Sequence, residues 1–129
     1  MPVADTSFII DLIRREPGAI RIYEQYESQG IALSTTAITA MELYKGAYVS
    51  GNRKNVEKVG SILGVFILLP VDEAVHEVFG KIAAGLCPNG KPISDFDEVI
   101  AAITLCSDGE IITRDPHFRN IPGLTAIGY

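Results

Sequence analysis

Four acidic residues stand at positions where a chain of alternating strands and helices would carry its chemistry. Asp5 directly follows one short apolar run, Asp115 stands just beyond another, and Glu42 and Asp97 lie in the opening turns of predicted helices. Carboxylates only a few ångströms apart raise one another's pKa, and a shared divalent cation relieves that repulsion. Because the group offers only oxygen ligands, it predicts a site for Mg²⁺ or Mn²⁺.

A cation held by these acids could activate a water molecule, orient it toward a phosphodiester and stabilise charge on the leaving oxygen. The acids therefore indicate hydrolysis of RNA or DNA. A phosphatase with an aspartyl nucleophile at Asp5 would need a second acid two positions later, where Ser7 stands. A phosphoacceptor domain would need paired acids at the first strand and a lysine after the last buried strand, and the sequence has neither.

Each acid also has a purely structural interpretation. Glu42 stands three residues after Thr39 and could complete a capping box. Asp95 and Glu98 have the same spacing, and if Asp95 caps its helix, Asp97 is free to bind a metal ion. Two positions apart on a helix, Asp95 and Asp97 point to nearly opposite sides, so Asp95 could support the site only indirectly.

The remaining two acids keep their alternatives as well. Asp115 precedes Pro116 and could serve only as a turn residue, and Asp5 could cap the helix that follows it. What favours a site is the joint placement of all four acids. Each is expected at the same edge of one sheet.

The apolar pattern along the chain predicts the elements that must position these acids. The first helix is expected from Phe8, with Thr6 or Ser7 as its cap, and Asp72 is expected to cap the fifth. Strands are expected at 1–4, 31–34, 66–69, 111–113 and 124–127, with the other helices at 17–30, 35–48, 56–63 and 95–106. This order predicts a three-layer α/β/α sandwich around a mostly parallel, twisted sheet, with 1–129 as one domain and the ligand crevice at the carboxyl ends of the strands.

Composition narrows the class of protein. With 47% hydrophobic and 21% charged residues, the chain of 129 residues should fold around its own core. Its net charge of −5 argues against binding nucleic acid by broad electrostatic attraction. A nucleic-acid substrate would therefore be bound through contacts close to the site. Cys87 and Cys106 lack the spacing of zinc ligands and are expected to be buried thiols. No apolar run is long enough for a membrane helix, and we expect a cytoplasmic protein.

Five segments, spread in order over the whole chain, carry a family resemblance. Together they resemble the PIN-domain family, specifically its VapC-type toxins. The segments are Val3-Ala4-Asp5-Thr6-Ser7, Thr39-Ala40-Met41-Glu42-Leu43, Asp97-Glu98-Val99-Ile100-Ala101-Ala102, Ile112-Thr113-Arg114-Asp115 and Phe118-Arg119-Asn120-Ile121-Pro122-Gly123-Leu124.

The resemblance implies a PIN-like fold and an endoribonuclease that depends on Mg²⁺ or Mn²⁺. It also implies a homodimer and a cognate VapB antitoxin whose carboxyl-terminal segment covers the acidic groove. By motif, Asp5 and Asp97 would be the principal metal ligands, Glu42 would hold a metal-bound water or a second ion, and Asp115 would complete the site.

Three further residues follow from the same resemblance and from their positions. Thr6 and Thr113 are expected to support the site with their hydroxyl groups. Arg114, beside Asp115, is expected to bind an RNA phosphate, although it could pair with an antitoxin carboxylate instead. The alternative function is a PIN-like binding module that no longer cleaves, and the presence of all four acids argues against it.

Overall fold

Five parallel strands form the centre of the protein. The computed structural model describes residues 1–86 and 93–129, and its sheet has the strand order β3-β2-β1-β4-β5. The strands are β1 (Val3–Ala4), β2 (Ser34–Thr36), β3 (Ile67–Leu69), β4 (Glu110–Ile112) and β5 (Thr125–Ile127). Every neighbouring pair is parallel, which confirms the predicted sheet.

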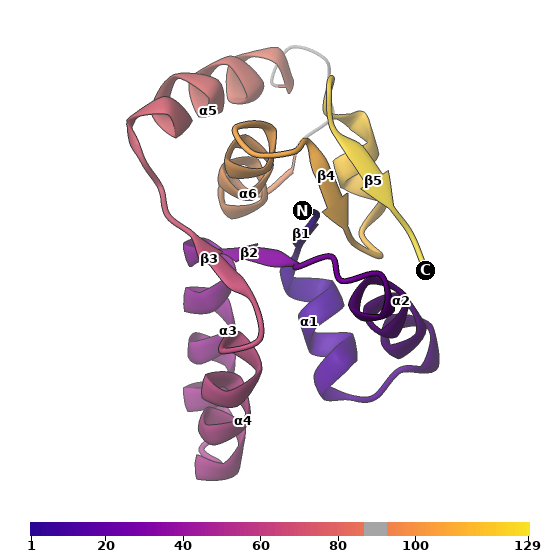
Figure 1. Ribbon diagram of the computed structural model, residues 1–129. Helices are drawn as coiled ribbons and strands as arrows, with labels where there is room; N and C mark the ends of the chain where they lie inside the picture. Colours follow the sequence, from indigo (N-terminus) through magenta and orange to yellow (C-terminus); the bar gives the residue numbers. More distant parts are fainter. Residues whose placement is uncertain (87–92) are drawn as a thin grey trace.

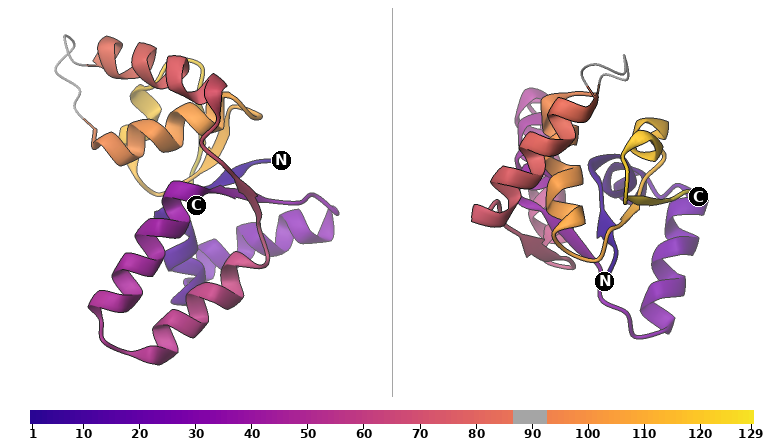
Figure 2. Two further views of the ribbon diagram at one scale, coloured as in Figure 1. Left: turned by 90° about the vertical axis from the view of Figure 1, so that its left-hand side faces the viewer. Right: turned by 90° about the horizontal axis from the view of Figure 1, so that it is seen from above.

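Helices cover both faces of this sheet, as Figures 1 and 2 show. The helices α5 and α6 lie on one face, α1 and α2 lie on the other, and α3 and α4 pack side by side and project away from the sheet. Their bounds are α1 (Thr6–Ile13), α2 (Pro17–Ser28), α3 (Ala37–Val49), α4 (Arg53–Leu63), α5 (Glu73–Leu86) and α6 (Asp95–Leu105), and a 3₁₀ helix, η1, spans Pro116–Asn120. The three-layer α/β/α architecture is therefore confirmed.

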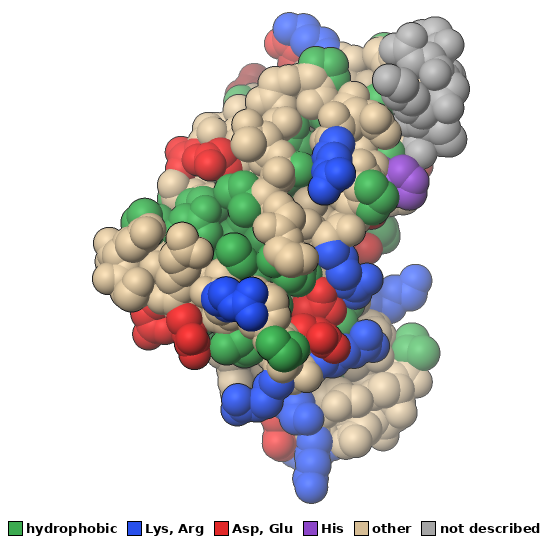
Figure 3. Space-filling view, turned by 90° about the vertical axis from the view of Figure 1, so that its right-hand side faces the viewer, with side chains coloured by type: hydrophobic (Ala, Val, Ile, Leu, Met, Phe, Trp, Pro, Cys, Tyr) green, Lys and Arg blue, Asp and Glu red, His purple; other side chains and the backbone are tan. Residues whose placement is uncertain are grey.

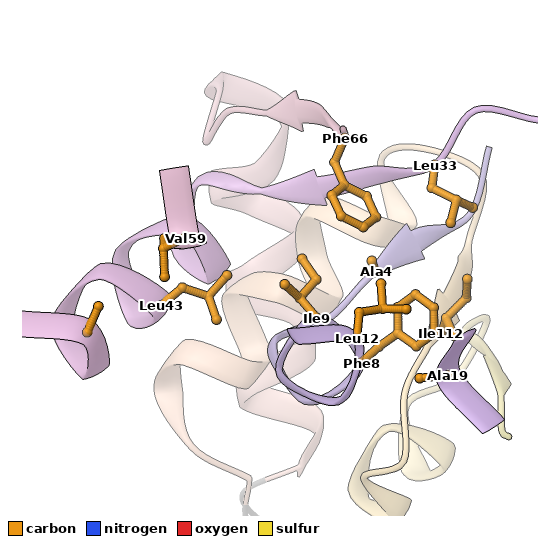
Figure 4. Packing of buried hydrophobic residues seen from close by; sticks show 11 residues of the cluster. Ala4, Phe8, Ile9, Leu12, Ala19, Leu33, Leu43, Val59, Phe66 and Ile112 are labelled. Carbon is orange, nitrogen blue, oxygen red and sulfur yellow. The ribbon is translucent and has the colours of Figure 1, made fainter. Parts of the chain in front are cut away.

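Two apolar cores hold the layers together. One lies under α1, where Phe8 and Ile9 meet Ala4 and Ile112 of the central strands (Figure 4). The other lies under α6, where Ile100 and Ile103 pack with Ile111. Ile111 and Ile112 belong to opposite cores because successive side chains of a strand point to opposite faces. Both faces of the central strands are thus buried, as expected of a parallel sheet.

The caps of three helices decide between the sequence-based alternatives, and the structural interpretation of Asp5 as a cap is confirmed. Asp5, rather than Thr6 or Ser7, caps α1, Thr36 caps α3, and Ser94 rather than Asp95 caps α6. Each cap accepts a hydrogen bond from a backbone N–H in the first turn, which satisfies a donor that the helix itself leaves free. Asp72 accepts from the Val75 N–H, as predicted for α5.

The second strand lies later in the chain than predicted, and it is polar. Ser34, Thr35 and Thr36 are all fully buried, whereas Ile31, in the predicted strand, is 39% exposed. Buried hydroxyls are tolerated because the neighbouring backbone accepts from them: Thr35 Oγ1 donates to the Ala4 carbonyl and Ser34 Oγ to the Pro2 carbonyl. A search for apolar runs could not locate such a strand.

The exposure of single residues tests the expectation of buried thiols. Cys106 is exposed, so the prediction of a buried thiol at this position was wrong; Cys87 lies outside the described residues. The edge strand β3 leaves Ile67 and Leu68 about half exposed. None of the described helices is both long and apolar enough to cross a membrane.

The strand order fixes where a site can form. From β1 the chain runs to β2 and β3 on one side of the sheet, and β4 and β5 lie on the other side. In open parallel sheets the ligand crevice lies at the carboxyl ends of the strands where this direction changes, which here is between β1 and β4. Asp5 follows β1 and Thr113 follows β4, so both stand at that crevice.

Candidate active site

Asp5 is the most deeply buried acid of the site, with 3% of its surface exposed. Its Oδ1 accepts from the Phe8 N–H (2.9 Å) and from Ser7 Oγ (2.8 Å), and its Oδ2 accepts from Thr113 Oγ1 (2.5 Å). Burial raises its pKa to about 6 and outweighs these hydrogen bonds, and the nearby charge of Asp97 raises it further. The carboxylate thus caps α1 with one oxygen and presents the other at the crevice.

Asp97 lies in the first turn of α6 and is half-buried. Its backbone N–H donates to Ser94 Oγ at 3.1 Å. Burial raises the pKa of its carboxyl, and the charge of Asp115 adds to that shift, while Ser94 and His117 act against it. Burial and the neighbouring acid thus outweigh the two groups that favour the ionised form.

Asp115 meets the other acids through Thr113. The Asp115 N–H donates to Thr113 Oγ1 (2.9 Å), the same hydroxyl that donates to Asp5. Asp115 Oδ1 accepts from the His117 N–H at 2.9 Å, which starts the 3₁₀ helix. The predicted turn role of Asp115 is therefore real, and it coexists with electrostatic coupling to Asp97. The structure thus links Asp5, Asp97 and Asp115 into one group.

Glu42 joins this group through a hydroxyl. Thr6 Oγ1 donates to Glu42 Oε1 at 2.7 Å and lies 3.1 Å from Thr39 Oγ1. Thr36 rather than Thr39 caps α3, so Glu42 completes no capping box. Since Thr6 is the next residue after Asp5, this hydrogen bond fixes Glu42 relative to the crevice.

Asp95 and Arg114 have other partners. Asp95 is exposed, and its charge acts on Glu98, a buried carboxylate whose Oε2 has no hydrogen-bond partner among residues 1–86 and 93–129. Arg114 Nε donates to Asp11 Oδ2 at 2.8 Å, and its side chain is 52% exposed. Tyr129 Oη donates to the same Asp11 oxygen at 2.5 Å. Arg114 thus combines a buried anchor with an exposed guanidinium.

Four contributing residues were missed by sequence reasoning. Ser7 bonds Asp5, His117 Nδ1 lies 2.9 Å from Asp115 Oδ1, and Asp11 and Tyr129 hold Arg114. Ser7 and His117 carried a local signal, because each stands two residues after the acid that it contacts. The other contacts depend on how distant segments pack.

The donor chemistry of this group fits a hard divalent cation. Among the described residues, no salt bridge to Lys or Arg neutralises Asp5, Asp97 or Glu42. Asp5 Oδ2, with one hydrogen bond, keeps a lone pair for an ion. Within 1–86 and 93–129, no three His, Cys, Asp or Glu side chains are close enough to enclose a metal ion alone. Mg²⁺ retains several waters and often takes only one or two carboxylates, so the arrangement suits a hydrated ion.

Comparisons with known proteins agree with this geometry. The family model of the PIN domain matches residues 3–124. The chain is 27% identical over 122 residues to the tRNA(fMet)-specific endonuclease VapC of Shigella flexneri, which is 93% of this chain and 91% of that protein.

Two solved structures extend the likeness over nearly the whole fold. DNA-bound VapBC from Salmonella typhimurium superposes with a TM-score of 0.87 at 28% identity, covering 99% of this chain and 98% of that one. VapBC-1 from nontypeable Haemophilus influenzae gives a TM-score of 0.85 at 28% identity, with coverage of 98% and 96%.

Proposed function

Because this chain belongs to the PIN-domain family, we propose that it is an endoribonuclease, the toxin of a toxin–antitoxin pair, and that residues 1–129 form its one nuclease domain. The observation that carries the proposal is the electrostatically coupled group of Asp5, Asp97 and Asp115 at the crevice between β1 and β4. RNA is the substrate class in the name of the Shigella relative. We place the activity in the cytoplasm, where such RNA is found.

The metal ion is proposed to be Mg²⁺ or Mn²⁺, held by Asp5 and Asp97 with Asp115 completing the site. Bound there, it would supply Lewis-acid stabilisation of the phosphate charge that develops during hydrolysis. Asp5, with a pKa of about 6, and Asp97 repel one another electrostatically, and a bound cation would offset that repulsion. Oxygen ligands alone favour Mg²⁺ or Mn²⁺ over softer metals.

The remaining side chains orient the reactants. Glu42, whose Oε1 is fixed by Thr6, has a second carboxylate oxygen that can accept a proton from the attacking water. The Thr113 hydroxyl fixes Asp5 and Asp115 relative to one another, because it donates to the Asp5 carboxylate and accepts from the Asp115 backbone N–H. Arg114 is the candidate for binding a phosphate oxygen of the RNA, because its guanidinium is partly exposed beside Asp115.

A VapB-like antitoxin is the proposed protein partner. The two superposed structures are VapBC assemblies, and this chain offers a groove that could take a peptide. The groove encloses about 810 Å³ between α1, α2 and α4, with an apolar floor and a rim that includes Arg15, Lys54 and Lys58. An antitoxin segment with apolar and acidic side chains would fit it.

A second copy of the chain is the other proposed partner. Met41, Tyr48 and Val49 of α3 are 57%, 69% and 80% exposed, and Ile67 and Leu68 of β3 add further exposed apolar surface. Exposed apolar surface of this kind is typical of an interface. Light scattering of the purified protein should give twice the mass of one chain.

The proposed activity is tested by cleavage of a mixed RNA pool with purified, antitoxin-free protein. The wild type is expected to cut the pool with Mg²⁺ or Mn²⁺ and to stop when EDTA is added. Asp97→Asn and Asp5→Asn should each lose at least about a hundredfold in rate, since each removes a charge that holds the ion. Glu24→Gln, a charge-matched change at an exposed position of α2, should cut like the wild type.

The outcomes separate the proposal from its alternative. If the wild type cuts no RNA with either metal but still binds an antitoxin, the chain is a PIN-like binding module without catalysis. Cleavage that survives in both Asp variants would show that the acidic group is not the catalytic site.

A further inference from the structure

Asp11 is a buried carboxylate on α1 outside the group of four acids. It is 5% exposed, and its Oδ2 accepts two hydrogen bonds, from Arg114 Nε (2.8 Å) and from Tyr129 Oη (2.5 Å). Asp11 lies in α1, Arg114 follows β4, and Tyr129 is the last residue of the chain. A buried charge held by such distant segments requires a reason beyond local structure.

Arg114 is fixed at both its backbone and its side chain. Its backbone N–H donates to Ser7 Oγ at 3.3 Å, and that hydroxyl donates to Asp5 Oδ1 at 2.8 Å. Its Nε is held by Asp11 and the Tyr129 hydroxyl also interacts with the guanidinium, which leaves most of its five N–H donors available. The guanidinium is therefore anchored near the crevice and retains free donors.

Tyr129 secures this anchor from the other side. Its ring packs edge-on against the buried Phe8, with the two ring centroids 5.3 Å apart. The ring also lies close to Gly18 of α2: a Cβ atom added to that glycine would be 3.4 Å from Tyr129 Cδ2. Burial and the nearby charge of Asp11 raise the pKa of Tyr129, so its phenol keeps its proton and remains a donor to Asp11. The chain terminus is thus packed against α1 and α2.

We propose that Asp11 and Tyr129 are positioning residues, which hold the Arg114 guanidinium so that its Nη groups bind a phosphate oxygen of the RNA strand at the acidic crevice. The inference rests on the proposed ribonuclease function and deepens it. A planar guanidinium held through Nε presents its two Nη groups as a fork, which matches the oxygens of a phosphate. On the face that carries α2 and the chain terminus, Lys and Arg side chains lie over the middle and lower part, with Asp and Glu side chains among them (Figure 3).

A simpler interpretation is that Arg114 only neutralises the buried Asp11. That role would affect stability but not the Michaelis constant, KM, for RNA. A double-mutant cycle separates the two roles, because coupling between Asp11 and Arg114 in substrate binding appears only if Asp11 acts through Arg114.

The experiment measures KM, kcat and melting temperature for wild type, Arg114→Ala, Asp11→Asn and the double variant on a mixed RNA pool with Mn²⁺. Arg114→Ala is expected to raise KM about tenfold with kcat nearly unchanged, as when a ground-state phosphate contact is lost. Asp11→Asn should raise KM about fivefold in the wild-type background and have almost no effect after Arg114→Ala. Arg21→Ala, an equal charge change at an exposed position of α2, should leave KM unchanged.

Two more variants guard against a folding defect in Asp11→Asn. Tyr129→Phe keeps the ring packing on Phe8 and removes only the hydroxyl, and it should raise KM about twofold. Arg114→Lys keeps the charge but loses the fork, and it should raise KM nearly as much as Arg114→Ala.

The inference is overturned if Asp11→Asn raises KM equally in both Arg114 backgrounds, or if it lowers the melting temperature with KM unchanged. An increase in KM for Arg21→Ala as large as for Arg114→Ala would also overturn it, since attraction would then be diffuse. These outcomes presuppose a wild type that cuts RNA. A wild type that does not cut refutes the proposed ribonuclease itself, which is a different result.

Discussion

Thr113 Oγ1 donates a hydrogen bond of 2.5 Å to Asp5 Oδ2, although 108 positions separate the two residues in the chain. The contact exists because β1 and β4 are parallel neighbours, so the residues that follow them emerge side by side. The same hydroxyl accepts from the Asp115 N–H. One threonine therefore sets the position of two acids of the proposed metal site.

Replacing Thr113 by Val should weaken binding of Mn²⁺ about fivefold to tenfold. The change removes the donor that holds Asp5 Oδ2 and the acceptor that holds the Asp115 backbone, each worth about 1 kcal/mol. Calorimetric titration of the purified protein with Mn²⁺ measures the effect. Thr104→Val, which also removes a buried hydroxyl bonded to a backbone carbonyl, should leave Mn²⁺ affinity unchanged.

Asp5 should make the metal-free protein less stable at neutral pH than in mild acid. Its pKa is about 6 in the folded protein against an ordinary value of 3.8, so between these values the folded state binds more protons than the unfolded state. The free energy of unfolding therefore falls as pH rises through this interval, by about 3 kcal/mol from this group alone. Asp5→Asn removes the cost of burying an ionised carboxylate, and Asn is still a good helix cap.

Denaturant unfolding in EDTA, at pH values from about 4 to about 7.5, checks this prediction. Asp5→Asn should exceed the wild type in stability at the upper end, and the difference should shrink toward the lower end. A difference that stays constant across the range would show that burial does not raise the pKa of Asp5. Addition of Mg²⁺ should restore stability to the wild type alone.

Thr6→Val should lower kcat about tenfold and leave KM and the melting temperature nearly unchanged. The hydroxyl of Thr6 is only partly buried and donates to Glu42 Oε1, so its loss frees Glu42 to rotate away from the attacking water. Thr6→Ser keeps the donor and should restore most of the rate. Equal kinetics for wild type and Thr6→Val would mean that Glu42 needs no fixed position.

Ile100→Ala should destabilise the protein by about 2–5 kcal/mol, because Ile100 is fully buried under α6 and its loss leaves a cavity. Urea unfolding gives the change in free energy. Phe96→Ala, on the same helix but 51% exposed, should cost far less. Equal losses in the two variants would contradict the assignment of the core beneath α6.

Most of the fold could be predicted because its signals are local. Pro17 and Gly30 delimit α2 as expected, and Gly30 has the positive φ of 68° that a residue ending a helix commonly adopts. The strand β2 could not be located, because Ser34, Thr35 and Thr36 resemble a loop in sequence, and only in the folded protein do Ser34 and Thr35 donate to the carbonyls of Pro2 and Ala4.

The candidate site shows the same division. The sequence predicted that Asp5, Asp97 and Asp115 follow a strand or begin a helix at one edge of the sheet. In the structure their charges interact. The contacts that hold Arg114 could not be predicted, since Asp11 lies 103 positions from Arg114 and 118 positions from Tyr129.

Local patterns were enough to predict the order of elements, the parallel sheet and the acids available to a metal ion, because periodicity and capping act over a few neighbouring residues. The folded chain was needed to show which hydroxyls fix those acids, which carboxylates share one electrostatic environment, and that Asp11 anchors Arg114. Those contacts join segments about a hundred positions apart, and their energies depend on burial and on distances that no local pattern encodes.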